Sequence, residues 1–147
     1  MVQSPKVFDL ALHKTAGHTL KRDLSASVND MGDGILNVEF HSILQPRLNP
    51  IDSSYIEMIN HALGLIEDGQ YRGMVIGHQG ANFCAGANLN LLLELSQNKQ
   101  WDALDFAVKT MQDMTQRIRF SKGPVVAAPF QLTLGGGTEI IQPAAHR

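Results

Sequence analysis

Two glycine-containing loops carry the residue types best suited to chemistry in this chain. They span residues 77–88 and 134–139, and each follows a short apolar run and leads into a helical pattern. Amide groups at the start of a helix lack backbone acceptors and lie at the positive end of the helix dipole. Because small residues there let a negatively charged oxygen come close, the two loops could together supply both donors of an oxyanion hole. For either loop alone, tight turns and close packing are the alternative explanation of its glycines.

The order of strand, glycine loop and helix is also that of nucleotide-binding sites. The chain has no G-x-G-x-x-G pattern, and residues 134–139 lack the Gly-Lys-Ser/Thr ending with which a P-loop holds phosphates and magnesium. We therefore expect no nucleotide at either loop.

Reactive side chains elsewhere form no pattern of a catalytic or metal site. Cys84, the single cysteine, lies inside the first loop, but no arrangement of His and Asp that would activate it is evident. Structural packing is therefore the favoured interpretation of this thiol. The histidines are scattered, and His13 and His18 lack the i, i+4 spacing of ligands on a helix, so we expect no metal.

Apolar periodicity around the loops predicts strands and helices in alternation. Strands are predicted at 35–40, 74–76 and 125–128, and helices at 49–68, 89–95, 101–118 and from 135 onward. In the first strand, Leu36, Val38 and Phe40 alternate with polar residues, which predicts one buried face. Asn49 followed by Pro50 predicts the start of the first helix. The apolar residues of the next two helices are expected to lie in the core.

Residues 1–33 differ from the rest of the chain and are predicted to form an N-terminal arm or linker. A short helix could begin near Phe8 and end at Gly17, and the polar run 21–25 has no periodicity. The globular domain is then predicted to span residues 34–147.

The composition indicates one globular domain and excludes several classes of protein. The 147 residues are 44% hydrophobic, with a single cysteine and 12 lysines and arginines against 14 acidic residues, a net charge of −2. A disulfide-stapled secreted module needs paired cysteines, and a nucleic-acid binder normally has a basic excess. No apolar run approaches the length of a membrane span, and the N-terminus lacks the apolar stretch of a signal peptide. We therefore expect a cytoplasmic protein with no nucleic-acid partner and no membrane span.

Three segments match longer motifs. Residues 82–89, N-F-C-A-G-A-N-L, resemble F-x-A-G-A-D-L, and residues 124–140 resemble P-V-V-A-A-V-N-G-x-A-L-G-G-G-C-E-L. Residues 47–51, R-L-N-P-I, resemble an L-N-A-L segment. These are motifs of the crotonase, or enoyl-CoA hydratase/isomerase, superfamily, which the chain resembles from about residue 34 to its end. In that superfamily the L-N-A-L segment lines the CoA site.

The resemblance implies an α/β protein with the crotonase, or ClpP-like, fold, which is a right-handed spiral of strand-strand-helix turns. It also implies an enzyme of fatty-acid β-oxidation that hydrates 2-enoyl-CoA thioesters. Isomerisation of Δ3 to Δ2 enoyl-CoA, or a non-catalytic acyl-CoA-binding or assembly role, are the alternatives. Residues 38–42, 75–80 and 128–130 more narrowly resemble the hydratase part of bacterial fusions with 3-hydroxyacyl-CoA dehydrogenase, so a fused dehydrogenase domain is a further expectation.

The resemblance assigns site residues position by position. The amides of Ala87 and Gly136 would hold the thioester oxygen, and Glu139 would be one of two glutamates that activate water and deliver a proton. For Glu139 the alternative is an acid favoured by the helix dipole. Contacts with the acyl-CoA substrate are implied for Leu48, Pro50, Ala85, Asn88, Leu89 and Gly135. No cofactor is implied in this domain, since CoA is part of the substrate and NAD would belong only to a fused dehydrogenase.

The family's second glutamate would lie beyond Arg147, the last residue of the chain. We therefore expect a fragment, truncated at its C-terminus and inactive by itself. Family members commonly form trimers through C-terminal helices, so a homo-oligomer is also expected of the longer protein. Two departures from the motifs lie at positions that do not supply the chemistry: Asn88 replaces aspartate, and residues 129–131 replace V-N-G. Gln131 and Thr133 stand where small residues are usual, so the resemblance does not imply the shape of the acyl pocket.

Overall fold

The computed structural model describes residues 8–144 of the protein. Its elements follow one another as α1 (Leu10–Thr15), β1 (Thr19–Arg22), β2 (Ala26–Asp30), β3 (Ile35–Phe40), α2 (Ser53–Glu67), β4 (Gly73–Ile76), α3 (Leu89–Gln97), α4 (Trp101–Arg119), β5 (Val125–Ala127) and α5 (Gly136–Ile141).

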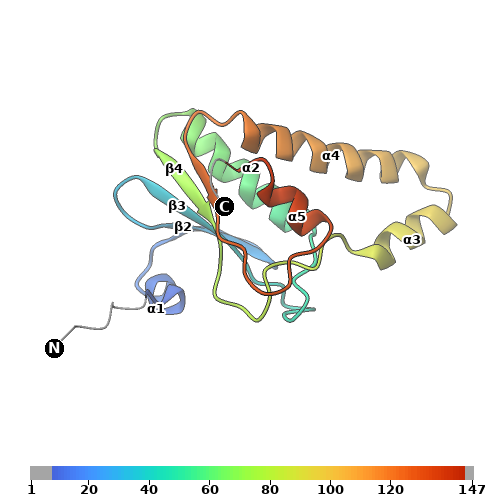
Figure 1. Ribbon diagram of the computed structural model, residues 1–147, viewed down its shortest axis with the longest axis horizontal. Coiled ribbons are helices and arrows are strands. Elements are labelled where there is room, and N and C mark those ends of the chain that lie inside the picture. The colour runs from blue at the N-terminus through green and yellow to red at the C-terminus, as the bar shows by residue number, and fades with distance from the viewer. Residues whose placement is uncertain (1–7, 145–147) are drawn as a thin grey trace.

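The strands form one mixed sheet in the order β1-β2-β3-β4-β5. β1 to β3 are antiparallel neighbours, whereas β4 and β5 continue the sheet from β3 as parallel strands. Parallel neighbours need a crossover, which α2 provides between β3 and β4, and α3 with α4 between β4 and β5. In Figure 1, α2, α4 and α5 lie on one side of the sheet and α1 on the other. Between residues 8 and 144, no helix is long and apolar enough to cross a membrane.

Residues 19–30, which we expected to belong to an arm or linker, are part of the sheet. β2 pairs with β3 over its whole length, and Ala26 and Val28 are fully buried in the core. The polar run 21–25 holds the end of β1 and the turn into β2. The expectation was wrong because β2 carries polar side chains on its second face, which hides its apolar alternation. The short helix predicted after Phe8 is confirmed as α1.

β3 has the bounds that the sequence predicts, but both of its faces are buried instead of one. Its apolar residues face the core under α2, as expected. On the opposite face, Asn37 and Glu39 are only 6% and 8% exposed. They are covered because they bind neighbouring polar groups: Asn29 of β2 donates to Asn37 at 3.1 Å, and Lys14 of α1 donates to Glu39 at 2.7 Å.

α2 begins later than predicted and ends where predicted. Its N-cap is Asp52, not Asn49, and the Asp52 carboxylate accepts from the Tyr55 amide at 3.3 Å. Asn49 instead has a φ of +51° and is buried. Its Oδ1 accepts hydrogen bonds from the Ser42 amide at 2.8 Å and the Tyr55 hydroxyl at 2.7 Å. Asn49 therefore anchors the segment before the helix.

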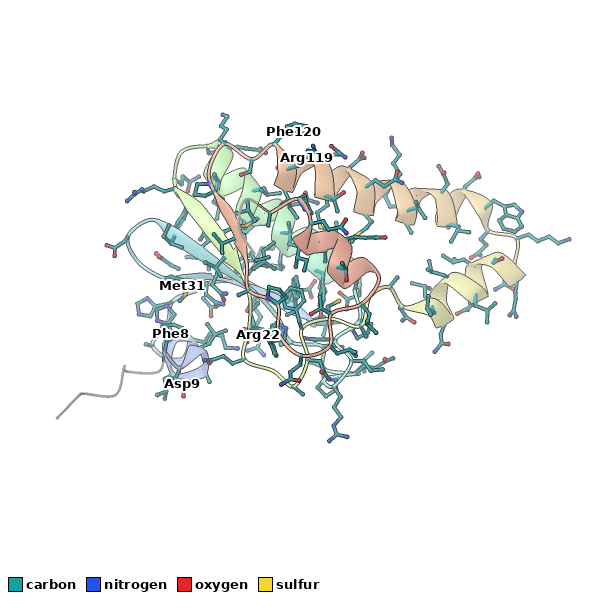
Figure 2. All side chains as sticks on the ribbon, viewed as in Figure 1. Phe8, Asp9, Arg22, Met31, Arg119 and Phe120 are labelled. Atoms are coloured by element: carbon teal, nitrogen blue, oxygen red, sulfur yellow. The ribbon has the colours of Figure 1, made fainter. Side chains whose placement is uncertain are left out.

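α3 and the first part of α4 lie outside the core, contrary to the prediction. No residue of α3 is buried, and in α4 only Met114 and Ile118 are. Figure 1 shows this helix pair projecting from the rest of the molecule. The end of α4, marked by Arg119 and Phe120 in Figure 2, returns to the body formed by α2 and the sheet. Periodicity thus predicts the two helices correctly, but not what surrounds them.

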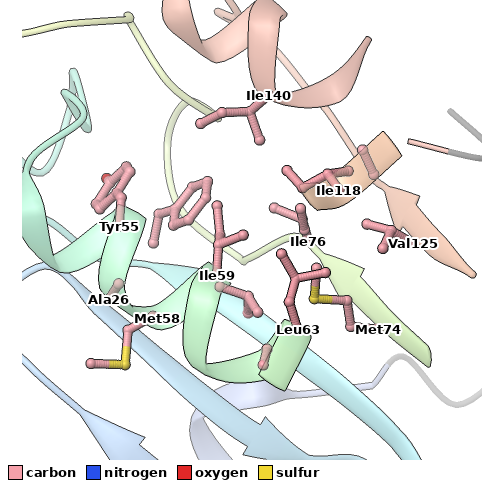
Figure 3. Packing of buried hydrophobic residues seen from close by; sticks show 14 of the residues in the cluster. Ala26, Tyr55, Met58, Ile59, Leu63, Met74, Ile76, Ile118, Val125 and Ile140 are labelled. Atoms are coloured by element: carbon pink, nitrogen blue, oxygen red, sulfur yellow. The ribbon is translucent and has the colours of Figure 1, made fainter. Parts of the chain in front are cut away.

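The core lies between α2 and the sheet. In Figure 3, Ile59 and Leu63 of α2 lie next to Ile76 of β4, and Tyr55 of α2 and Ile140 of α5 belong to the same cluster. All five side chains are fully buried. Burial of one such side chain contributes about 1.5–3 kcal/mol. Ile140 therefore anchors α5, and with it the second glycine loop, in the core.

Candidate active site

The two glycine loops lie side by side in the structure. Cys84 joins them, because its amide donates to the carbonyl of Leu132 at 3.1 Å and its carbonyl accepts from the Leu134 amide at 2.9 Å. On its other side the first loop is tied to the segment before α2, where the Ile51 amide donates to the carbonyl of Gly86 at 2.8 Å. The end of the first loop is therefore held between that segment and the second loop.

Two glycines are required by this close approach. A Cβ atom on Gly86, whose φ is +96°, would lie 2.9 Å from the carbonyl oxygen of Leu134 and 3.1 Å from the amide nitrogen of Gly136. A Cβ atom on Gly137 would lie 2.7 Å from the carbonyl oxygen of Cys84. Close packing explains both glycines, and the same packing brings the start of α5 against the end of the first loop.

The backbone amides of Ala87 and Gly136 meet at this junction. A Cβ atom on Gly136 would lie 3.6 Å from the nitrogen of Ala87, so the two residues are neighbours across the loops. Within residues 8–144, neither amide donates a hydrogen bond to a protein acceptor. Two neighbouring donors without acceptors can hold a negatively charged oxygen.

Glu139 lies one helical turn beyond Gly136. Its side chain is exposed and lines the same cavity as the amides of Gly136 and Ala87. In the part of the chain that the structure describes, its carboxylate has no hydrogen-bond or ion-pair partner. A carboxylate placed in this way is available to exchange a proton with a bound molecule.

A cavity of about 980 Å³ opens in front of these groups, between α2, α4 and α5. Apolar side chains form much of its wall, among them Ile51, Ile56, Leu92, Val108 and Met111. An apolar cavity of this size with a few polar groups at one end is typical of a small-molecule site.

The structure brings together four of the residues that the resemblance assigned to the site. Ala87, Asn88, Gly136 and Glu139 line the cavity, whereas Leu48, Pro50, Ala85, Leu89 and Gly135 do not. Leu48 and Ala85 instead hold the first loop in place, since the Ala85 amide donates to the carbonyl of Leu48 at 2.8 Å. Asn88 caps α3, with its side chain accepting from the Leu91 amide.

Cys84 is fully buried where the two loops meet. Burial raises the pKa of this thiol to about 11. A buried thiol that rarely ionises is a poor nucleophile, which supports a packing role. Between residues 8 and 144, no group of three or more His, Cys, Asp or Glu side chains could hold a metal ion.

A buried network behind the first loop was not predicted from the sequence. The ring of His78 lies against those of Phe83 and Phe130. Its Nε2 lies 3.0 Å from the carbonyl oxygen of Phe83 and 3.3 Å from Nδ2 of Asn49. Burial lowers the pKa of His78, so the neutral ring is favoured. These residues lie in three segments far apart in the sequence, so no local pattern could have brought them together.

The sequence of this chain is similar to one known family and to longer bacterial proteins. Residues 44–147 match the family described as enoyl-CoA hydratase/isomerase. A Bacillus subtilis (strain 168) protein named "Probable 3-hydroxyacyl-CoA dehydrogenase" is 43% identical over 136 residues, which are 92% of this chain and 16% of that protein. A Rickettsia prowazekii (strain Madrid E) protein, named as a trifunctional enzyme of a fatty acid oxidation complex, is 24% identical over 71% of this chain and 14% of its own.

Structural comparison supports the expected fold. The crystal structure of an enoyl-CoA hydratase from Polaromonas sp. JS666 has a TM-score of 0.71 with this chain at 22% identity, covering 82% of this chain and 46% of its own. The α/β crotonase fold is thereby confirmed. The chain spans less than half of that structure, and only a small part of the two longer relatives. The family match over residues 44–147 and the 43% identity to the Bacillus subtilis protein show that this chain belongs to the enoyl-CoA hydratase/isomerase family.

Proposed function

We propose that this chain supplies the oxyanion hole and one acid/base carboxylate of an enoyl-CoA hydratase. The observation that carries the proposal is the pair of amides of Ala87 and Gly136, which have no acceptor within residues 8–144. They lie at the wall of an apolar cavity of about 980 Å³ that Glu139 also lines. The cavity suits the acyl group of a thioester, and the amides suit its carbonyl oxygen.

In the proposed reaction, the thioester oxygen accepts hydrogen bonds from the amides of Ala87 and Gly136. These donors stabilise the enolate charge that builds on the oxygen as water adds to C3, and losing one such donor typically costs about 2.7–4 kcal/mol. Glu139 moves a proton, either from the attacking water or to C2. The product is a 3-hydroxyacyl-CoA, with the hydroxyl on C3 and the new hydrogen on C2, so the step needs no resident cofactor.

The relatives' names support a place for this reaction in fatty-acid oxidation. A 3-hydroxyacyl-CoA dehydrogenase acts on the product that a hydratase forms, so the two activities are consecutive. We therefore propose that the protein carrying this chain also has a dehydrogenase part, with NAD bound there, and that it works in the cytoplasm.

The experiment that tests this function is the hydration of crotonyl-CoA by the full-length protein that carries this chain. Glu139→Gln keeps the shape of the side chain and removes the titrating carboxylate. We expect this variant to lose turnover by about 10²-fold or more and to retain acyl-CoA binding, as general acid/base catalysis typically contributes that much. Glu94→Gln is the matched control, because Glu94 is also an exposed helical glutamate but does not line the cavity.

The other outcomes separate the alternatives. Unchanged hydration in the Glu139→Gln protein would show that the role given to Glu139 is wrong. A wild-type protein that does not hydrate crotonyl-CoA but converts a 3-enoyl-CoA to its 2-enoyl isomer would be an isomerase. Binding without either reaction would indicate a non-catalytic acyl-CoA-binding domain.

A further inference from the structure

α1 is fastened to the polar face of the sheet, on the side opposite α2. Lys14 Nζ donates to both carboxylate oxygens of Glu39, at 2.7 and 3.0 Å. His13 Nε2 lies 2.6 Å from the carbonyl oxygen of Asp30. Leu10 is the buried residue of this helix, so most of its attachment is polar. A helix with few buried apolar contacts opens locally at a low cost in free energy, so its polar contacts contribute much of its stability.

A single side chain of the first glycine loop completes the start of this helix. Gln79 Oε1 accepts from the amide of Leu10 at 2.7 Å, and Gln79 Nε2 donates to the carbonyl of Phe8 at 2.6 Å. Leu10 is the first residue of α1, whose amide has no acceptor inside the helix. The Gln79 amide therefore joins the loop to the backbone of residues 8–10, near the Phe8 and Asp9 labels in Figure 2.

The same loop leads from Gln79 to Ala87 without a helix or strand of its own. Its order depends on contacts with other segments. Next to Gln79, the His78 ring is held by Nε2 at 3.0 Å from the carbonyl oxygen of Phe83. The Phe83 amide in turn donates to the carbonyl of Phe130, in the segment between β5 and the second loop, at 3.3 Å. α1 therefore contacts the loop near its start, at Gln79, and the proposed oxyanion donor Ala87 lies near the end of the same loop.

We propose that α1 helps to position the loop of residues 77–88 through Gln79, so that undocking of α1 loosens the loop and makes the amide of Ala87 less well ordered. Gln79 is then a positioning residue, since it touches the backbone of α1 and does not line the cavity. The consequence for catalysis rests on the proposed function, whereas the mechanical coupling between α1 and the loop does not. Under this proposal, α1 contributes to the activity by positioning the first loop and does not serve only as a linker.

The test compares Gln79→Ala with the wild type in the full-length protein that carries this chain. Gln70→Ala is the matched control, because Gln70 is also an exposed loop glutamine, and within residues 8–144 its side chain has no partner. Amide hydrogen exchange is measured for residues 8–18 and 80–88. Steady-state hydration of crotonyl-CoA is measured on the same proteins.

We expect Gln79→Ala to speed exchange in both segments by about threefold to tenfold, the change that loss of hydrogen bonds of ordinary strength produces. We expect kcat to fall by a similar factor with KM nearly unchanged, because the loop is loosened and the cavity is not. Lys14→Gln, which weakens the attachment of α1 to Glu39 of the sheet, should have the same effects. If both residues act through α1, the double variant should lose little more than the more affected single variant.

Faster exchange confined to residues 8–18 would overturn the proposal, because α1 would then rest on the loop without holding it. Equal exchange in wild type and Gln79→Ala would also overturn it. If exchange rises in both segments but the wild type does not hydrate crotonyl-CoA, the coupling stands and the proposed function fails. If hydration proceeds at the wild-type kcat while residues 80–88 exchange faster, the loop is coupled to α1 but does not position Ala87, and the proposal is wrong.

Discussion

Gly136 is the residue at which one added methyl group would most directly disturb the proposed oxyanion hole. A Cβ atom there would lie 2.7 Å from Cδ1 of Ile51 and 3.6 Å from the amide nitrogen of Ala87. The Ile51 atom ends a flexible side chain and can move aside, but the methyl group would still occupy space beside both amides. We expect Gly136→Ala to lower kcat/KM for crotonyl-CoA by about 10²-fold or more, the loss typical of a missing oxyanion donor. The melting temperature should change little, and wild-type turnover would contradict the assignment.

His78 should make stability depend on pH below its ordinary pKa of 6.5. Burial lowers the pKa of His78 in the folded protein, so the unfolded chain binds a proton more readily. Stability is therefore complete above pH 6.5 and falls as the pH drops below it. We expect His78→Gln, measured by urea unfolding between pH 5 and 7, to flatten this dependence, by at most about 1.4 kcal/mol per pH unit. The lowered pKa of His41 leaves part of the slope in the variant, and an unchanged slope would show that His78 does not contribute.

The sequence predicts which residues meet at one cavity where those residues belong to contiguous motifs. Ala87, Gly136 and Glu139 lie in two such motifs, and the fold brings all three to one cavity. Asn49 was misread as a helix cap because cap residues and buried turn residues have the same polar types. Its actual role depends on a φ of +51° and on Tyr55, which reaches it only after α2 has folded.

The contact between α5 and the first loop decides whether the second loop is held in place. A Cβ atom on Gly137 would lie 2.7 Å from the carbonyl oxygen of Cys84, a backbone atom that cannot move aside cheaply. We expect Gly137→Ala to destabilise the protein by about 1–3 kcal/mol, as overpacking typically does. Gly64→Ala is the matched control, since nothing lies within 4 Å of a Cβ atom there in α2, and it should stabilise by about 0.5–1 kcal/mol. Urea unfolding of both variants checks the pair, and equal stabilities would refute the close contact.

Helices and strands could be predicted from the sequence wherever a single apolar pattern identified the type of element. β3, β4 and β5 are confirmed close to their predicted bounds, because buried strands are short apolar runs or clear alternations. β2 was missed because its second face carries polar residues, Ser27 and Asn29, whose side chains bind polar groups of the neighbouring strands β1 and β3. The helices α3 and α4 were predicted correctly, but their burial in the core was not. Periodicity shows that a helix has an apolar face, but it does not show whether another element packs against that face.

At the scale of the whole molecule, α3 and the first part of α4 leave a large apolar surface in water. Leu89, Leu91, Leu93, Trp101, Phe106 and Val108 are each at least 47% exposed. Because many exposed apolar side chains on one helix pair favour association, we expect the 147-residue chain by itself to form oligomers that grow with concentration in light scattering. Leu93→Glu should shift the chain toward the monomer, whereas Leu44→Glu should not, since Leu44 is 92% exposed but lies outside this helix pair. A wild-type chain that stays monomeric at all concentrations and unfolds cooperatively would contradict this prediction. It would show that the chain is stable with the apolar side chains of α3 and α4 exposed to water.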